Sequence, residues 1–129
     1  MNTPPDLPPS LTPEQRSGIL REAVSLQQRR QPELFSRYDD RQMDLVRQDT
    51  AYHLDFLTQA LRYGSSALFR DYAAWLKVFL PRIGVTPAAI ETSLQAVAEA
   101  LRPVLAADAA ARAAQYVEEA RVRLAALAK

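Results

Sequence analysis

The chain has 129 residues, a length typical of one domain with its own hydrophobic core. Its 16 basic and 15 acidic residues leave a formal net charge of +1, which gives no electrostatic reason to expect nucleic acid or an anionic membrane as a partner. The lack of cysteine excludes disulfides, thiolate metal sites and thiol nucleophiles. The same lack of cysteine makes a cytoplasmic protein the simplest expectation. No apolar run approaches the roughly 20 residues that span a bilayer.

The chain opens with a proline-rich stretch. Residues 1–11 hold four of the nine prolines and few apolar side chains, which predicts a disordered tail before a single helical domain over residues 12–129. The first helix is expected to begin after Thr12, because a hydroxyl N-cap, then Pro13, then Gln15 is typical of a helix start. It is expected to reach about Arg29 and to bury four residues: Ile19, Leu20, Ala23 and Val24.

Pro32 is expected to interrupt this helix, because the residue before a proline disfavours helical backbone. A short turn over residues 32–38 should then place Leu34 and Phe35 in the core.

The clearest helix prediction runs from Asp40 to Tyr63, with Gly64 as its stop. At about 100° per residue, one stripe of this helix is mostly apolar. The stripe contains Met43, Val46, Thr50, His53, Leu54, Leu57, Ala60 and Leu61, and the opposite face contains Asp44, Gln48, Asp55, Thr58, Gln59 and Arg62.

A further helix is expected from Ser65 or Ser66 towards Ile83, closed by Gly84 and kinked or shortened by Pro81. Its predicted buried stripe is Leu68, Phe69, Tyr72, Trp75, Leu76, Phe79, Leu80 and Ile83.

Two more helices complete the prediction. Thr86 and Pro87 repeat the hydroxyl-then-proline start, Pro103 bends or ends that helix, and Asp108 is expected to cap the last one. Their inward residues are predicted as Ile90, Leu94, Val97, Leu101 and Leu105, and as Ala113, Tyr116, Val117, Ala120, Leu124 and Leu127. The short connections favour antiparallel neighbours, and the sequence therefore predicts an all-α bundle of four long helices plus an N-terminal helix and a short turn.

His53, the sole histidine, falls near the centre of an apolar stripe, and Asp49 precedes it by one helical turn. One interpretation is a core histidine that is hydrogen-bonded to Asp49 or to a backbone carbonyl. The alternatives are a ligand-binding or sensing site, in which the carboxylate orients the imidazole, and a catalytic pair. Residue types and spacing leave all three open.

Aromatic residues are concentrated on the two central helices. If these helices pack together, several rings are expected to line an apolar pocket beside His53, with Asp71 as an acceptor near Trp75; an ordinary aromatic core is the alternative. The aromatic residues are Tyr52, Phe56, Phe69, Tyr72, Trp75 and Phe79.

Motifs of known enzyme classes are missing from the sequence. It contains no glycine-rich phosphate loop, no nucleophile elbow and no His-Glu pair with metalloprotease spacing. A di-iron bundle needs two Glu-x-x-His motifs, which one histidine cannot supply. These observations favour a non-catalytic protein.

Two central stretches carry a family resemblance: Asp49-x-x-x-His53-Leu54-x-Phe56-Leu57-x-x-Ala60-Leu61 and Leu68-Phe69-x-Asp71-Tyr72-x-x-Trp75-Leu76. Together they resemble helical sensor modules of bacterial signalling proteins, which stand before cobalamin-binding or stress-regulator output domains and include globin-like folds without haem. The likeness covers residues 40–105 and rests on a pattern. It implies a dimeric regulatory domain that signals by helix rearrangement, with any output domain on a separate protein or trimmed away.

The globin comparison implies that the helix over residues 40–63 lies on the distal side of the pocket. The next helix lacks the proximal histidine that such a fold would supply, so haem ligation would depend on His53 alone or on a tyrosine such as Tyr72. This departure favours the haem-free interpretation.

The leading hypothesis is a non-catalytic bacterial sensor or interaction domain that binds a partner or a small apolar ligand, as a homodimer or with a regulatory protein. Its site residues are expected to be His53, Asp49, Tyr52, Phe56, Tyr72 and Trp75. The alternative is a globin-like protein that binds haem or another tetrapyrrole through His53. An enzyme based on Asp49 and His53 is the third hypothesis.

Overall fold

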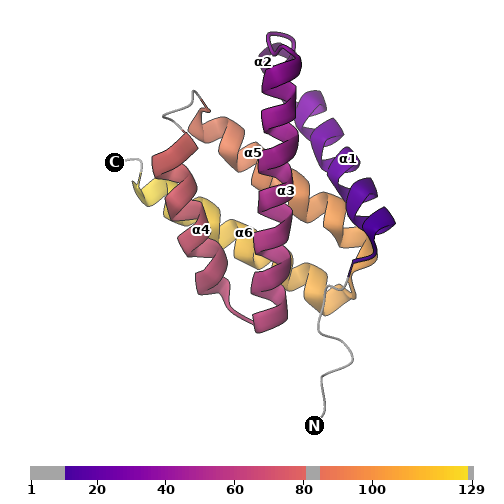
Figure 1. The fold of residues 1–129 in the computed structure, drawn as a ribbon. Coiled ribbons are helices and arrows are strands. Elements are labelled where there is room, and N and C mark those ends of the chain that lie inside the picture. Colours follow the sequence, from indigo (N-terminus) through magenta and orange to yellow (C-terminus); the bar gives the residue numbers. More distant parts are fainter. Residues whose placement is uncertain (1–10, 81–84, 128–129) are drawn as a thin grey trace.

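The computed structural model describes residues 11–80 and 85–127, the side chain of Leu127 excepted. This part of the chain is all helical, as predicted (Figure 1). The elements are α1 (Pro13–Arg30), α2 (Pro32–Phe35), α3 (Asp40–Tyr63), α4 (Ser66–Phe79), α5 (Pro87–Leu101), the 3-10 helix η2 (Arg102–Val104) and α6 (Ala107–Leu127).

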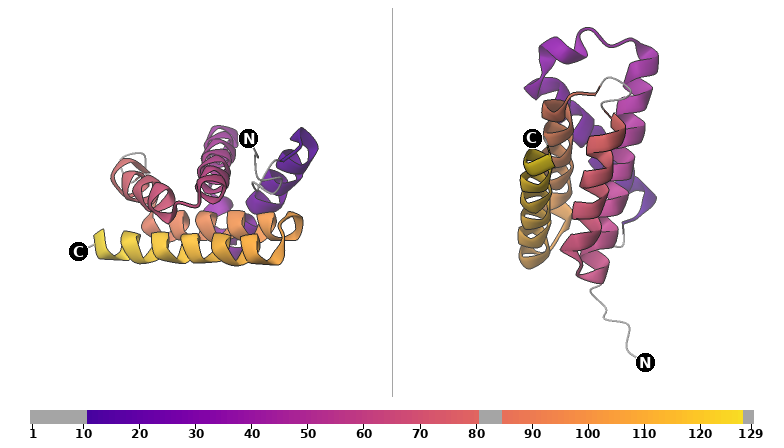
Figure 2. Two further views of the ribbon diagram at one scale, coloured as in Figure 1. Left: turned by 90° about the horizontal axis from the view of Figure 1, so that it is seen from below. Right: turned by 90° about the vertical axis from the view of Figure 1, so that its left-hand side faces the viewer.

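The helices form two layers. Figure 2 shows α5 and α6 side by side and antiparallel in one layer, with α1, α3 and α4 lying across them in the other. Helix α1 packs mainly on α5 and α4 mainly on α6, while α3 lies between them and contacts both layers. The buried apolar side chains form one cluster. The prediction of an all-α helical bundle is therefore confirmed.

Local signals determine where the helices begin. The Thr12 hydroxyl accepts a hydrogen bond from the Gln15 backbone N–H at 3.1 Å, and the Gln15 side chain returns a bond to the Thr12 backbone at 3.0 Å, so the predicted capping box is present. Ser65 and Thr86 cap α4 and α5 through their hydroxyls. Asp108 lies inside the first turn of α6 rather than at its cap, because α6 begins at Ala107.

Gly64 ends α3 in the left-handed conformation, with φ of 60°. A Cβ at this position would meet no atom within 4 Å, so Gly64→Ala should cost only backbone strain, about 1 kcal/mol of unfolding free energy. Gly18→Ala in α1 should have the opposite effect and stabilise by about 0.5–1 kcal/mol, since alanine favours helix and the site is open. Urea unfolding of both variants tests the pair, and a destabilised Gly18→Ala variant would contradict it.

The predicted inward stripes are mostly confirmed. In α3 every stripe residue from Thr50 to Leu61 is buried, and in α5 the four predicted residues from Ile90 to Leu101 are buried. Other predicted core residues are only half-buried: Leu20, Val24, Leu34, Phe35, Met43, Val46, Leu68 and Leu105. Asp55 and Thr58, expected to face solvent, are also half-buried, and Asp55 forms a 3.0 Å ion pair with Arg16.

Helix α4 departs from the prediction. Trp75 is 55% exposed and Phe79 is 40% exposed, although both were expected in the core. Helix α4 leans away from α3 with distance from the turn at Gly64 (Figures 1 and 2). Trp75 and Phe79 line the groove between the two helices instead of packing in the core. Trp75 is one position, about 100° around the helix, from the buried Leu76.

Some of the sequence-based predictions concern residues that the structure does not describe. The tail over residues 1–10, Pro81, Ile83 and Gly84, and the inward side chain of Leu127 lie outside the described residues. Leu11, assigned to the tail, packs against the core. Among the described helices, none is both long and apolar enough to cross a membrane.

Candidate functional site

His53 is buried at the centre of a three-helix hydrogen-bonded chain. Its ring is 1% exposed, its Nδ1 lies 2.6 Å from the Tyr72 hydroxyl of α4, and its Nε2 lies 3.0 Å from the Ser93 hydroxyl of α5. The Ser93 hydroxyl donates its proton to the Ile90 carbonyl at 2.7 Å, so it accepts from His53 Nε2–H. Nδ1 is then unprotonated and accepts from the Tyr72 O–H. The chain of donors therefore fixes one neutral tautomer.

Burial shifts the pKa values of His53 and Tyr72, the two titratable residues of this hydrogen-bonded chain, towards their neutral forms. It lowers the pKa of His53 from 6.5 to about 3, because the charged imidazolium has no water around it. Burial, and after it the negative charges of Asp49 and Asp55, raise the pKa of Tyr72 well above its ordinary value of 10.0. Near neutral pH both side chains are uncharged.

The prediction that Asp49 orients His53 is wrong. Both ring nitrogens are occupied by hydroxyl groups from other helices, so the imidazole has no donor left for that carboxylate. Asp49 and His53 are four residues apart on α3, which favours contact between their side chains. The imidazole instead bonds to Tyr72 of α4 and Ser93 of α5.

In this conformation His53 is not positioned as a general base or as an iron ligand. Each nitrogen would have to give up a hydrogen bond, and the Tyr72 hydroxyl is engaged by the same ring. The residues present thus do not fit a haem held by His53. The described residues also contain no group of three or more His, Cys, Asp or Glu side chains that could hold a metal ion.

Sequence reasoning missed the polar partners of this core. Ser93 falls between Ile90 and Val97 on the inward stripe of α5, so its helical position was the available signal. Gln27 is also buried, and its Nε2 donates to the Thr50 hydroxyl at 3.0 Å. These groups border a cavity of about 40 Å³ that His53 also lines.

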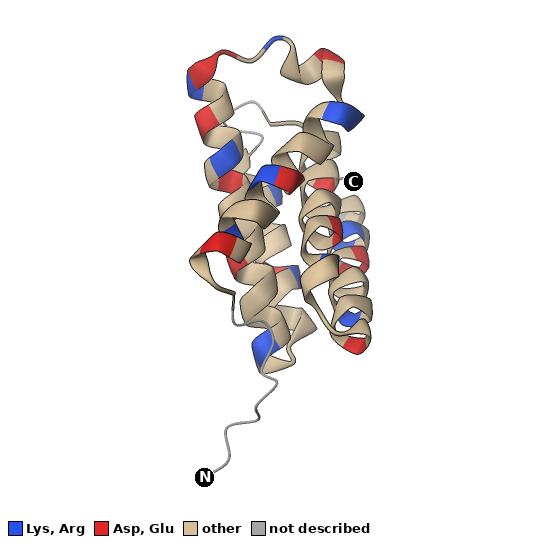
Figure 3. Cartoon of the chain, turned by 90° about the vertical axis from the view of Figure 1, so that its right-hand side faces the viewer, with Lys and Arg blue, Asp and Glu red and all other residues tan. Residues whose placement is uncertain are grey.

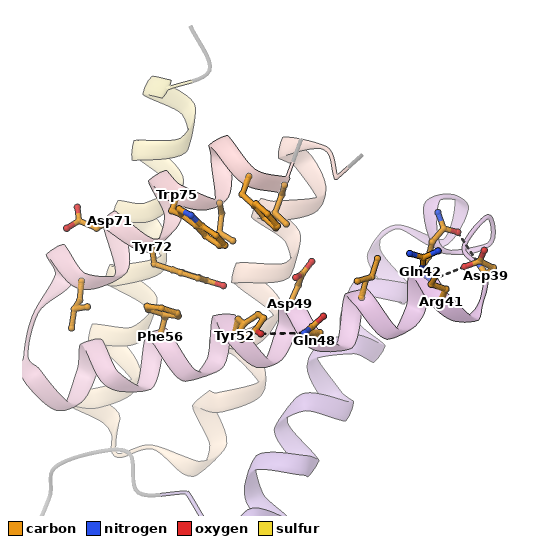
Figure 4. Close-up of a pocket in the computed structure, with 15 residues that line it drawn as sticks. Asp39, Arg41, Gln42, Gln48, Asp49, Tyr52, Phe56, Asp71, Tyr72 and Trp75 are labelled. Atoms are coloured by element: carbon orange, nitrogen blue, oxygen red, sulfur yellow. Dashed lines mark hydrogen bonds between the residues drawn. The ribbon is translucent and has the colours of Figure 1, made fainter. Parts of the chain in front are cut away.

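A much larger groove opens between α3 and α4 (Figure 4). Its volume is about 1080 Å³, at the top of the roughly 300–1,000 Å³ that small-molecule sites occupy. His53 does not line it, whereas Tyr72, whose hydroxyl contacts the imidazole, does. Of the predicted site residues, five line it: Asp49, Tyr52, Phe56, Tyr72 and Trp75.

Stacked aromatic rings form one wall of the groove. Phe56 and Tyr72 stack with ring centroids 4.1 Å apart, Trp75 follows Tyr72 at 6.4 Å, and Phe79 follows Trp75 at 4.8 Å. Phe56, Trp75 and Phe79 are 36–55% exposed, as is Tyr52 on α3 at 49%. Phe69, predicted on the buried stripe of α4, is buried in the core and does not line the groove. An apolar patch of this kind, rimmed by polar residues, is typical of an interaction site.

Charged residues are spread thinly around this wall. Asp49 is half-buried in the groove, Asp71 is exposed near Trp75, and Asp39 and Arg41 lie at the far end (Figure 4). Trp75 is exposed enough that its indole N–H needs no protein acceptor, so the expected role of Asp71 is not required. On the face shown in Figure 3, basic and acidic residues alternate without a single-sign patch.

The chain thus combines a neutral polar core at His53 with an exposed aromatic groove on the other side of Tyr72. Its sequence matches no protein-family model and no curated protein.

Proposed function

We propose that this chain is a non-catalytic sensor or interaction domain that binds an apolar, aromatic ligand in the groove between α3 and α4. The observation that carries the proposal is the row of stacked rings at Phe56, Tyr72, Trp75 and Phe79, all of which are exposed except the buried Tyr72. Exposed aromatic surface is costly in water, and a flat apolar ligand would cover it with favourable stacking.

Tyr72 connects the groove to the buried hydrogen bonds that join α3, α4 and α5. Its ring forms part of the groove wall, while its hydroxyl donates to His53, which in turn donates to Ser93 on α5. A ligand that shifts the Tyr72 ring must strain or break this buried chain. Binding at the surface is thereby coupled to the contacts among α3, α4 and α5, as a sensor requires.

The resemblance to bacterial sensor modules supports the same class of function and adds the expectation of a homodimer. The aromatic groove is compatible with a regulatory role, because it is large and lies between two helices that diverge from the turn that joins them. Light scattering across a range of protein concentrations would test the dimer separately from ligand binding.

Nile red, a neutral apolar dye, should bind the full chain with a rise in its fluorescence. Trp75→Ala should weaken this binding about tenfold with little change in stability, because Trp75 is exposed and contributes contact area rather than core packing. Tyr63→Ala provides the control, since Tyr63 is an aromatic residue of α3 that is 73% exposed and does not line the groove. Equal dye affinity in the two variants, or no dye binding by the unmodified chain, would refute the proposal.

A further inference from the structure

The side chain of Asp49 is the one feature of the groove that apolar binding does not explain. It projects from α3 into the space that also receives the hydroxyl end of Tyr72 (Figure 4). The carboxylate lies close enough for its charge to raise the pKa of Tyr72. Asp49 is half-buried, and burial raises its own pKa from the ordinary 3.8. A carboxylate has thus been partly removed from water beside an aromatic wall.

Among the described residues, no group compensates this charge. In the described residues, the five ion pairs involve other carboxylates, and no hydrogen bond reaches the Asp49 side chain. The neighbouring polar groups are engaged elsewhere: the Tyr72 hydroxyl donates to His53, and Gln48 donates to Tyr52. Arg41 is the one basic side chain among the described groove residues, and it lies eight residues away, about 12 Å along α3.

The whole groove favours positive charge. Among the described residues, three carboxylates line it, Asp39, Asp49 and Asp71, against the single guanidinium of Arg41. The faces of Trp, Tyr and Phe rings carry a negative electrostatic potential, which attracts organic cations. An anionic ligand would meet both the carboxylates and the ring faces unfavourably.

We propose that the groove is a site for a lipophilic organic cation, whose aromatic body stacks on Trp75 and Phe79 and whose charge lies opposite the Asp49 carboxylate. This inference rests on the proposed function and adds the sign of the ligand's charge. The cation supplies the partner that Asp49 lacks among the described residues, and the rings supply cation–π contacts around it.

Three probes that share one ring system separate charge from apolar contact: (2-naphthylmethyl)trimethylammonium, neutral 2-naphthalenemethanol and anionic 2-naphthylacetate. Binding to the full chain is measured by calorimetry and by the shift of the indole N–H signal, which belongs to Trp75 because the chain has one tryptophan. We expect the cation to bind at least about tenfold more tightly than the alcohol, and the anion to bind most weakly.

Asp49→Asn keeps the shape of the side chain and removes its charge. We expect the variant to bind the cation and the alcohol within about threefold of each other, with the alcohol affinity unchanged. Asp44→Asn is the matched control, because Asp44 is an exposed aspartate of the same helix outside the groove. It should retain the preference for the cation.

The outcomes distinguish this inference from the function on which it rests. Equal affinity for the cation and the alcohol in the unmodified chain, or a preference that survives Asp49→Asn, would overturn the inference while Nile red binding still supported an apolar site. Failure of all the naphthyl probes together with Nile red would overturn both. A ligand-free dimer that Trp75→Ala dissociates would assign the groove to a second copy of the chain and would also overturn the inference.

Discussion

Lowering the pH from 7 to 5 should reduce the free energy of unfolding by about 2 kcal/mol through His53 alone. In the folded protein, burial lowers the pKa of His53 from 6.5 to about 3, so the imidazole stays neutral across this range. In the unfolded chain the same group takes up a proton below pH 6.5. The stabilising contribution is therefore fully present above pH 6.5 and is lost progressively as the pH falls towards 3.

Urea unfolding at half-unit pH steps measures this slope. His53 is the only histidine, so His53→Leu should remove most of the pH dependence between pH 7 and pH 5. The raised pKa of Asp49 acts in the opposite sense, because the folded state then holds its proton more tightly, and its effect grows at lower pH. Nuclear magnetic resonance of the imidazole nitrogens provides a test that needs no variant. A folded-state titration near pH 6.5 would contradict the buried arrangement.

Replacing Tyr72 by phenylalanine should destabilise the fold by about 1–3 kcal/mol. The substitution keeps the ring in place and removes only the hydroxyl, which leaves the buried Nδ1 of His53 without its 2.6 Å donor. Tyr116→Phe is the control, because Tyr116 is equally buried at 6% and forms no hydrogen bond with the described residues. We expect that control to change stability by less than about 0.5 kcal/mol.

A double-mutant cycle isolates the hydrogen bond. In the His53→Leu background the Tyr72 hydroxyl has lost its acceptor, so Tyr72→Phe should be neutral or stabilising, and the coupling energy should lie at about 0.5–3 kcal/mol. Independent, additive effects of the two substitutions would refute the hydrogen-bonded chain. Because Tyr72→Phe retains the ring, Nile red affinity should stay near that of the unmodified protein, which separates core stability from groove binding.

His53 and Asp49 lie on one helix but in different environments, one in the core and the other in the groove. His53 attracts attention in the sequence because it is unique, yet its nitrogens are satisfied within the core and only Tyr72 connects it to the groove. Asp49, expected to orient His53, faces the groove instead and forms no ion pair within the part of the chain that the structure describes. Under the proposed function, Tyr72 would transmit ligand binding to the core, and Asp49 would select the ligand by its charge.

Local sequence was sufficient to predict the helices. The hydroxyl and proline pairs at Thr12 and Thr86 and the glycine at position 64 act on backbone groups a few residues away, so their effect does not depend on the rest of the fold. The apolar stripe of α3 was equally readable, because a helix with one apolar face must turn that face to the core.

The candidate site depended on contacts between residues far apart in the chain. Periodicity showed that His53 points inward, but it could not show that Tyr72 and Ser93, 19 and 40 residues further on, would occupy its two nitrogens before Asp49 did. It likewise grouped Trp75 and Phe79 with the buried side of α4, although the lean of α4 away from α3 leaves both exposed. Helix periodicity fixes the direction of a side chain relative to its own helix, whereas burial and hydrogen bonding depend on the angle at which the next helix packs, which only the tertiary structure decides.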